Sequence, residues 1–170
     1  MNSMHQAVAK LEAALKENEF VSIPNMNVAQ VRYIYGSLNL YYLNQIVQNE
    51  VSQAAQFTNE EMMMASSFGD MAIEIIQINH TLGLPSLSEY QIKETHYFVS
   101  SIFELFARVD QALSRLSLAL LTVDPEKGEQ MDQTLLTDVL DLIASLAHYC
   151  GFSLKISIVL AVDDFIDYLL

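Results

Sequence analysis

The chain has 170 residues, a length typical of one domain with its own hydrophobic core, so we expect residues 1–170 to form a single domain. Its 21 acidic and 8 basic residues give a formal charge of -13, and the scattered basic residues argue against a surface that binds DNA or RNA. Apolar residues make up 52% of the chain and charged residues 17%, which leaves little polar surface to cover a monomer. We therefore expect a homo-oligomer, either a dimer or a tetramer.

The chain carries one cysteine, Cys150, which has no partner for an internal disulfide. Residues 1–20 do not show the charged segment and apolar core of a secretory signal. The apolar run at 156–162 is far shorter than the roughly 18 residues that a membrane span requires. These features predict a cytoplasmic protein without a transmembrane helix.

The first two helices are predicted from capping boxes, in which a small polar residue is followed three residues later by Glu or Gln. Ser3 has this spacing before a helix that we expect over residues 3–19. Asn27 has it before a second helix that we expect to extend from 27 toward 57. Gly36 inside the second helix costs about 1 kcal/mol relative to Ala and therefore indicates a close crossing with another helix.

The second helix is rich in tyrosine, and stacking on nucleic-acid bases is one use for such residues. The tyrosines recur at helical spacing and have few cations near them, which favours packing in the core or in an interface. They are Tyr33, Tyr35, Tyr41 and Tyr42.

A third helix is predicted over residues 58–82 and ends at Gly83. Its run of methionines is typical of adaptable core packing rather than of metal ligands. Asp70 and Glu74 are four residues apart and therefore share one face of this helix. A solvent-facing acidic edge is the simpler interpretation of this pair, and a cation site is the more specific one.

A fourth helix is predicted over residues 86–122, because apolar residues recur along it on more than half of its circumference. After a loop, the chain ends in a helical hairpin that turns at Gly151. Asp138 and Asp141 lie three apart near the start of the hairpin and share an edge that could hold a cation. The sequence thus predicts an all-α bundle of about six helices.

Several common catalytic motifs are absent from the sequence. The five glycines form no phosphate-binding loop, and the sequence has neither an HExxH zinc motif nor the Glu-x-x-His pairs of di-iron bundles. His148 and Cys150 are two residues apart on one helix and point in different directions, which argues against a nucleophile and base pair.

Two stretches together resemble the motifs of the MazG-like all-α nucleoside triphosphate pyrophosphohydrolases. In that family one helix carries Glu-Glu-x-x-Glu, and a later helix carries Glu-x-x-Asp-Val-Leu followed by Leu-Ala, Gly and Leu. Residues 66–72 resemble the first motif in shape, and residues 135–154 resemble the second at the family's spacing. Asp70 and Asp138 are the family ligands that match by position.

The resemblance implies a Mg²⁺-dependent hydrolysis of a nucleoside triphosphate to a monophosphate and pyrophosphate. Mg²⁺ needs only a few carboxylates because it keeps several waters, so Glu74 and Asp141 could complete a site with Asp70 and Asp138. The chain departs from the family at Ser66, Ser67 and Leu135, where the family has glutamates, and it has a long predicted helix between the motifs. The alternative is therefore a non-catalytic helical interaction or scaffold protein that kept the fold and lost the metal ligands.

Overall fold

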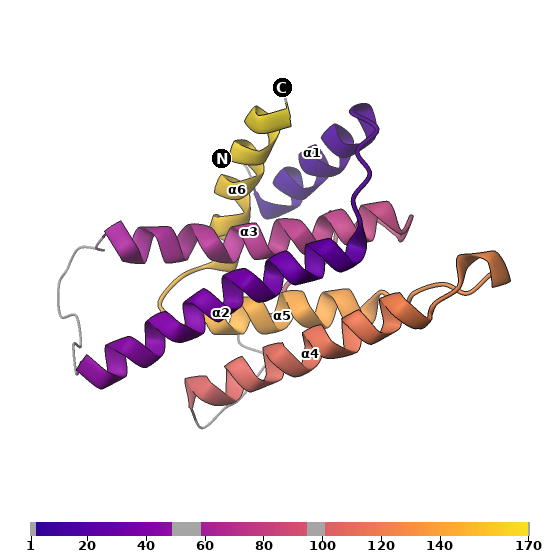
Figure 1. Cartoon of the computed structure of the whole chain (residues 1–170). Coiled ribbons are helices and arrows are strands. Elements are labelled where there is room, and N and C mark those ends of the chain that lie inside the picture. Colours follow the sequence, from indigo (N-terminus) through magenta and orange to yellow (C-terminus); the bar gives the residue numbers. More distant parts are fainter. Residues whose placement is uncertain (1–2, 49–58, 95–100, 170) are drawn as a thin grey trace.

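The computed structural model describes residues 3–48, 59–94 and 101–169, and within these residues the regular structure is helical throughout (Figure 1). The helices are α1 (Met4–Glu17), α2 (Pro24–Gln48), α3 (Asn59–Thr81), α4 (Ile102–Thr122), the single 3₁₀ turn η1 (Pro125–Lys127), α5 (Thr134–Tyr149) and α6 (Leu154–Leu169). The predicted all-α bundle of about six helices is confirmed.

Helix α3 occupies the centre of the bundle and packs against α1, α2, α5 and α6. Helices α1 and α6 lie side by side on one side of α3, while α4 packs against α5 and α2 (Figure 1). The most deeply buried helix is α5, in which nearly every residue between Leu136 and Ala147 is buried. Removal of this apolar surface from water is the main favourable contribution to folding.

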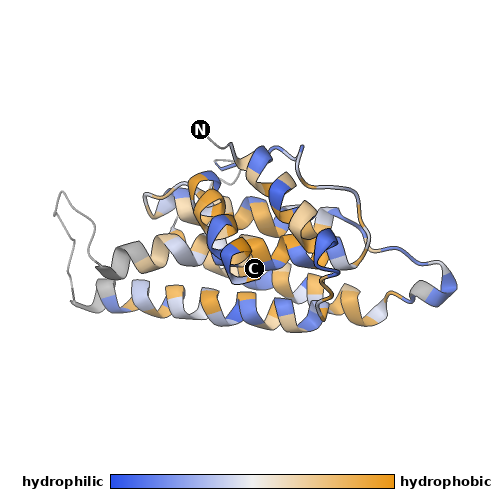
Figure 2. Ribbon diagram, turned by 90° about the horizontal axis from the view of Figure 1, so that it is seen from above, coloured by the Kyte–Doolittle hydropathy of each residue, from blue (hydrophilic) through white to orange (hydrophobic). Residues whose placement is uncertain are grey.

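Hydrophobic residues extend along the packed helices, whereas the turn around η1 is hydrophilic (Figure 2). No single helix in the described ranges is both long and apolar enough to cross a membrane. Helices α5 and α6 reach the length and apolar composition of a membrane span only when they are taken together, and the angle between them is 110°.

The predicted helix ends at both glycine turns are confirmed. Gly83 and Gly151 adopt the left-handed φ values of 67° and 85° that glycine favours. After each glycine the chain bonds back to the preceding helix, through Leu84 N to Asn79 O and Phe152 N to Ala147 O. The capping box of Ser3 at the start of α1 is also present.

The start of the second helix differs from its prediction. Helix α2 begins at Pro24, whose fixed φ suits a first helical turn, and Asn27 lies inside the helix instead of capping it. The backbone N–H of Asn27 bonds to Ile23 O, and its side chain is buried. The predicted continuation of this helix toward residue 57 passes outside the described residues after Gln48.

The predicted fourth helix over 86–122 was wrong in its first part. Residues 84–94 form turns and irregular structure, residues 95–100 lie outside the described ranges, and the helix begins at Ile102. The apolar spacing here arises from an irregular segment that buries Leu87 and Ile92 against the bundle. Bonds from this segment to a buried aspartate on α5 hold it in place.

The close helix crossing expected at Gly36 is found instead at Gly69. A Cβ atom at Gly36 would meet nothing within 4 Å, so no other described helix approaches it. A Cβ atom at Gly69 on α3 would lie 2.3 Å from the backbone oxygen of Ser157 on α6. Glycine at this position therefore permits α3 and α6 to pack at backbone contact.

Candidate functional site

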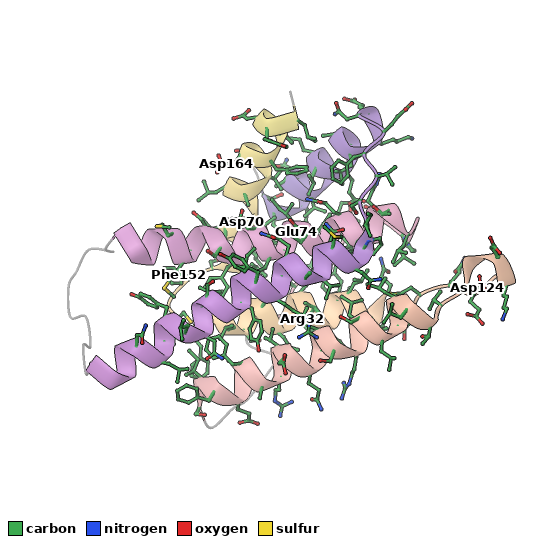
Figure 3. The ribbon with its side chains drawn as sticks, viewed as in Figure 1. Arg32, Asp70, Glu74, Asp124, Phe152 and Asp164 are labelled. Carbon is green, nitrogen blue, oxygen red and sulfur yellow. The ribbon has the colours of Figure 1, made fainter. Side chains whose placement is uncertain are left out.

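The first predicted acidic residue, Asp70, lies on the face of α3 that turns toward α6 (Figure 3). The contact at Gly69 brings the two helices together at this point, with Asp164 of α6 nearby. Burial, followed by the negative charge of Asp164, raises the pKa of Asp70 above its ordinary value. Among the described residues, neither Asp70 nor Asp164 forms an ion pair that would neutralise this repulsion.

The second predicted residue, Glu74, lies one turn further along α3 and faces α2 as well. The amide nitrogen of Asn27 donates to Glu74 Oε2 at 2.5 Å and to Gln77 Oε1 at 3.3 Å. Burial raises the pKa of Glu74, the bond from Asn27 opposes this shift, and the charge of Asp70 adds to it. Asp70 and Glu74 thus form the pair that the sequence predicted.

Asn27 is the least expected member of this group. Its side chain is 7% exposed, and its Oδ1 atom is the one buried side-chain nitrogen or oxygen atom without a hydrogen-bond partner in the described part of the chain. Such an unpaired carbonyl costs about 1–3 kcal/mol when it is removed from water. Native structures usually satisfy such an atom with a water or an ion.

The third predicted residue, Asp138, has different surroundings. It is exposed on α5 and lines a small hollow of about 90 Å³ between α5 and α4, together with the arginines at 108 and 115. Arg108 makes an ion pair with Glu104 of its own helix, at 3.1 Å. Asp138 therefore faces cationic side chains of α4.

The fourth predicted residue, Asp141, is 3% exposed and has a structural role. Its two oxygens accept hydrogen bonds from the Tyr90 hydroxyl at 2.7 Å and from the Lys93 backbone N–H at 3.0 Å. Burial, followed by the bond to Asp141, raises the pKa of Tyr90 well above its ordinary value. Asp141 fixes the irregular segment 84–94 to the bundle and has both oxygens engaged.

The structure therefore brings together Asp70 and Glu74, and it places Asp138 and Asp141 in two other environments. Across the residues that the structure describes, no three His, Cys, Asp or Glu side chains are grouped so that they could hold a metal ion. The single shared site of four carboxylates is not seen. Helical spacing placed Asp70 and Glu74 on one face, but it carries no information on how α3 and α5 are rotated relative to each other.

Sequence reasoning missed two residues beside Asp70 and Glu74. The sequence predicts Asn27 as a helix cap, and its buried position depends on the contact between α2 and α3. Asp164 belongs to no motif in the sequence, and its place near Asp70 depends on the contact between α3 and α6.

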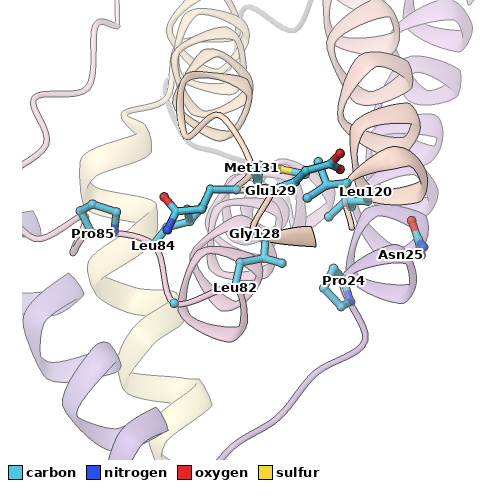
Figure 4. A pocket seen from close by; sticks show the side chains of 12 residues that line it. Pro24, Asn25, Leu82, Leu84, Pro85, Leu120, Gly128, Glu129 and Met131 are labelled. Carbon is cyan, nitrogen blue, oxygen red and sulfur yellow. The ribbon is translucent and has the colours of Figure 1, made fainter. Parts of the chain in front are cut away.

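A separate hollow of about 450 Å³ lies where the end of α3, the start of α2 and the connection from α4 to α5 meet (Figure 4). Its lining consists mostly of apolar side chains and of backbone atoms, and Pro24, Leu82 and Met131 are among its residues. Its carboxylate, Glu129, accepts a hydrogen bond from the backbone of Asp124 at 2.8 Å. The hollow is not lined by any of the four predicted ligands.

Comparisons with protein-family models, with curated proteins and with solved structures found no match for this chain. The resemblance to the MazG-like family is therefore supported by no family match. The part of the chain that the structure describes forms an all-α bundle of six helices.

Proposed function

We propose that this chain is a non-catalytic helical interaction protein, and that its partner is a second copy of the same chain. The proposed docking face is the groove between α2 and the start of α3, of about 290 Å³. Its lining residues are Tyr33, Ile34, Ser37, Leu38, Tyr41, Met63, Met64 and Ser67, and the exposed Leu40 lies beside it on α2.

The observation that carries this proposal is the exposure of large apolar side chains on this face. Tyr33, Met63 and Leu40 are 73%, 71% and 61% exposed. Full burial of one such side chain contributes roughly 1.5–3 kcal/mol, so a contact that covers all three gains a substantial part of the free energy of association. Contiguous apolar surface of this kind is typical of protein interfaces.

Charge favours a second copy as the occupant. The chain carries a formal charge of -13, so two copies repel each other over most of their surfaces. From Tyr33 to Gln48, α2 contains no charged residue, and the groove lining contains none either. This face is therefore a place where two copies can approach without bringing acidic side chains together.

The surroundings of the predicted ligands support an interaction protein over a hydrolase. Asp141 is engaged by two hydrogen bonds, and Asp138 faces α4, away from the partners of Asp70. A nucleoside triphosphate pyrophosphohydrolase dependent on Mg²⁺ is the second candidate, supported by the adjacent carboxylates of Asp70 and Glu74. Release of pyrophosphate from a panel of nucleoside triphosphates with Mg²⁺ tests it, and no release from any of them contradicts it.

Light scattering of the wild type and of two matched double variants tests the docking face. Tyr33→Ser with Leu40→Ser removes apolar surface from the face without adding charge. The control, Leu121→Ser with Tyr168→Ser, removes side chains that are 72% and 84% exposed on α4 and α6.

We expect the wild type and the control to have a mass of about twice 19.2 kDa and the face variant to have the mass of one chain. A wild type that stays at 19.2 kDa at high concentration contradicts the proposal. Dissociation of the control variant alone would place the interface elsewhere.

A further inference from the structure

Helix α2 is apolar on both of its faces. Its inner face is buried in the bundle through Val28, Val31 and Leu38. On its outer face, residues spaced alternately by three and four positions form one row along the helix. This outer row consists of Met26, Ala29, Tyr33, Gly36, Leu40 and Leu43, and all six are exposed. A helix that is apolar all round is typically buried, whereas a surface helix carries polar and charged residues on its outer face.

The outer row has the spacing of a helix that packs against another helix. Its alternate members are seven residues apart, which is the repeat of the apolar positions in a coiled coil. Tyr33 also lines the groove between α2 and the start of α3, and the exposed Leu40 lies beside that groove. The outer row and the proposed docking face are therefore one continuous surface.

Gly36 lies at the middle of α2, twelve residues from Pro24 and twelve from Gln48. Glycine inside a helix is destabilising relative to alanine, and a close approach of another backbone is a common reason for its presence. A Cβ atom at Gly36 would meet nothing within 4 Å, so no described part of the same chain makes that approach. The approach therefore has to come from another molecule.

The charges on α2 favour a second α2 as the helix that packs there. Arg32 is the one charged residue in the sequence of α2, and its guanidinium is paired with Asp110 of its own chain at 3.0 Å. The outer row itself is uncharged, so two α2 helices can pack together without bringing like charges into contact. Other outer surfaces of a chain with a formal charge of -13 offer less favourable contacts.

We infer that α2 packs across α2 of the second copy, with Gly36 of each copy at the point of closest approach. In a two-fold symmetric dimer, a residue on the axis faces the same residue of the other copy. Glycine at that point lets the two helix axes come closer than the roughly 8–10 Å that larger side chains impose. This inference rests on the proposed self-association and adds the geometry of the contact.

Substitutions of increasing size at Gly36 test this geometry on the full chain. Gly36→Ala and Gly36→Leu introduce side chains where the described chain leaves open space around the Cβ atom, so the monomer should keep its fold. Circular dichroism of dilute samples verifies that fold. The matched control is Ala107→Leu, which enlarges an exposed side chain on α4.

Light scattering over a series of concentrations measures the dissociation constant of each dimer. We expect Gly36→Leu to raise this constant by about 10-fold or more, because a large side chain from each copy then lies at the crossing. Gly36→Ala should raise it by a smaller factor, and Ala107→Leu should leave it unchanged.

Two outcomes separate a wrong geometry from a wrong function. If Gly36→Leu associates as tightly as the wild type while Tyr33→Ser with Leu40→Ser dissociates, the docking face stands and the crossing at Gly36 is overturned. A wild type that stays monomeric at high concentration contradicts both proposals. Equal weakening by Gly36→Leu and Ala107→Leu would also overturn the crossing at Gly36.

Discussion

Replacement of Gly69 by alanine is the sharpest test of how α3 and α6 pack. The new Cβ atom would lie 2.3 Å from Ser157 O, 2.7 Å from Ser157 C and 2.9 Å from Ala161 Cβ. The first two atoms belong to the backbone, so no side-chain rotation relieves the clash and α6 must move as a unit. Overpacking of a core costs about 1–3 kcal/mol of stability. Because the new atom would contact backbone, we expect the cost of Gly69→Ala to lie at or above the upper end of this range.

Alanine also favours the helix by about 1 kcal/mol relative to glycine, which offsets part of this cost. We therefore expect Gly69→Ala to lower the free energy of unfolding by about 2 kcal/mol and the melting temperature by roughly 4–8 °C. Urea and thermal unfolding, followed by circular dichroism, measure both quantities.

Gly36→Ala is the matched control, because it makes the same chemical change inside α2 where a Cβ atom meets nothing within 4 Å. It should raise the free energy of unfolding by up to about 1 kcal/mol. Both variants are made in the Tyr33→Ser, Leu40→Ser background, so that self-association through α2 does not contribute to the measured free energy of unfolding. A Gly69→Ala protein as stable as its parent would refute the backbone contact between α3 and α6.

Three further predictions follow from individual side chains. Asp141→Ala removes the acceptor of the Tyr90 hydroxyl and of the Lys93 N–H, so it should reduce the free energy of unfolding in urea by about 3 kcal/mol and speed proteolysis within residues 84–94. Unchanged proteolysis would contradict the role of Asp141 in holding that segment. Burial raises the pKa of the Cys150 thiol to about 11, so a thiol reagent at pH 8 should react slowly with the folded chain and rapidly with the chain unfolded in urea. Equal reaction rates for the folded and unfolded chains would contradict the burial of this thiol. Hydrogen bonds from Thr134 lower the pKa of Asp132 below its ordinary value of 3.8. The stability that Asp132 contributes is therefore present above that pH and is lost as the pH falls through its folded-state pKa. Urea unfolding at both pH values should show that Asp132→Ala destabilises the chain at pH 7 but not in strong acid.

Local signals in the sequence predicted helix ends well. The capping box of Ser3 and the glycine turns at Gly83 and Gly151 depend on residues within one or two helical turns, so their geometry can be inferred without knowledge of the fold. The prediction failed where tertiary contacts decide the conformation. Residues 84–94 have apolar residues compatible with a helix, but burial of Leu87 and Ile92 and the bonds to Asp141 hold them in an irregular path.

In the candidate site, too, local spacing was predicted correctly, whereas positions that depend on tertiary contacts were not. The four-residue spacing of Asp70 and Glu74 predicted that these two side chains share a face of the helix. It could not predict that Asp138 faces α4, because this depends on the rotation of α5 in the bundle. The buried position of Asn27 depends on the contact between α2 and α3, and no pattern of single residues encodes that contact.

Chemical cross-linking through an introduced cysteine tests the proposed interaction most directly. In a Cys150→Ser background, Leu40→Cys places a thiol beside the docking groove, and Tyr168→Cys places one at a site that is 84% exposed on α6. We expect a short bismaleimide to produce a covalent dimer of the Leu40→Cys protein and little dimer of the Tyr168→Cys protein. Equal yields from the two proteins, or no covalent dimer from Leu40→Cys, would contradict self-association through α2.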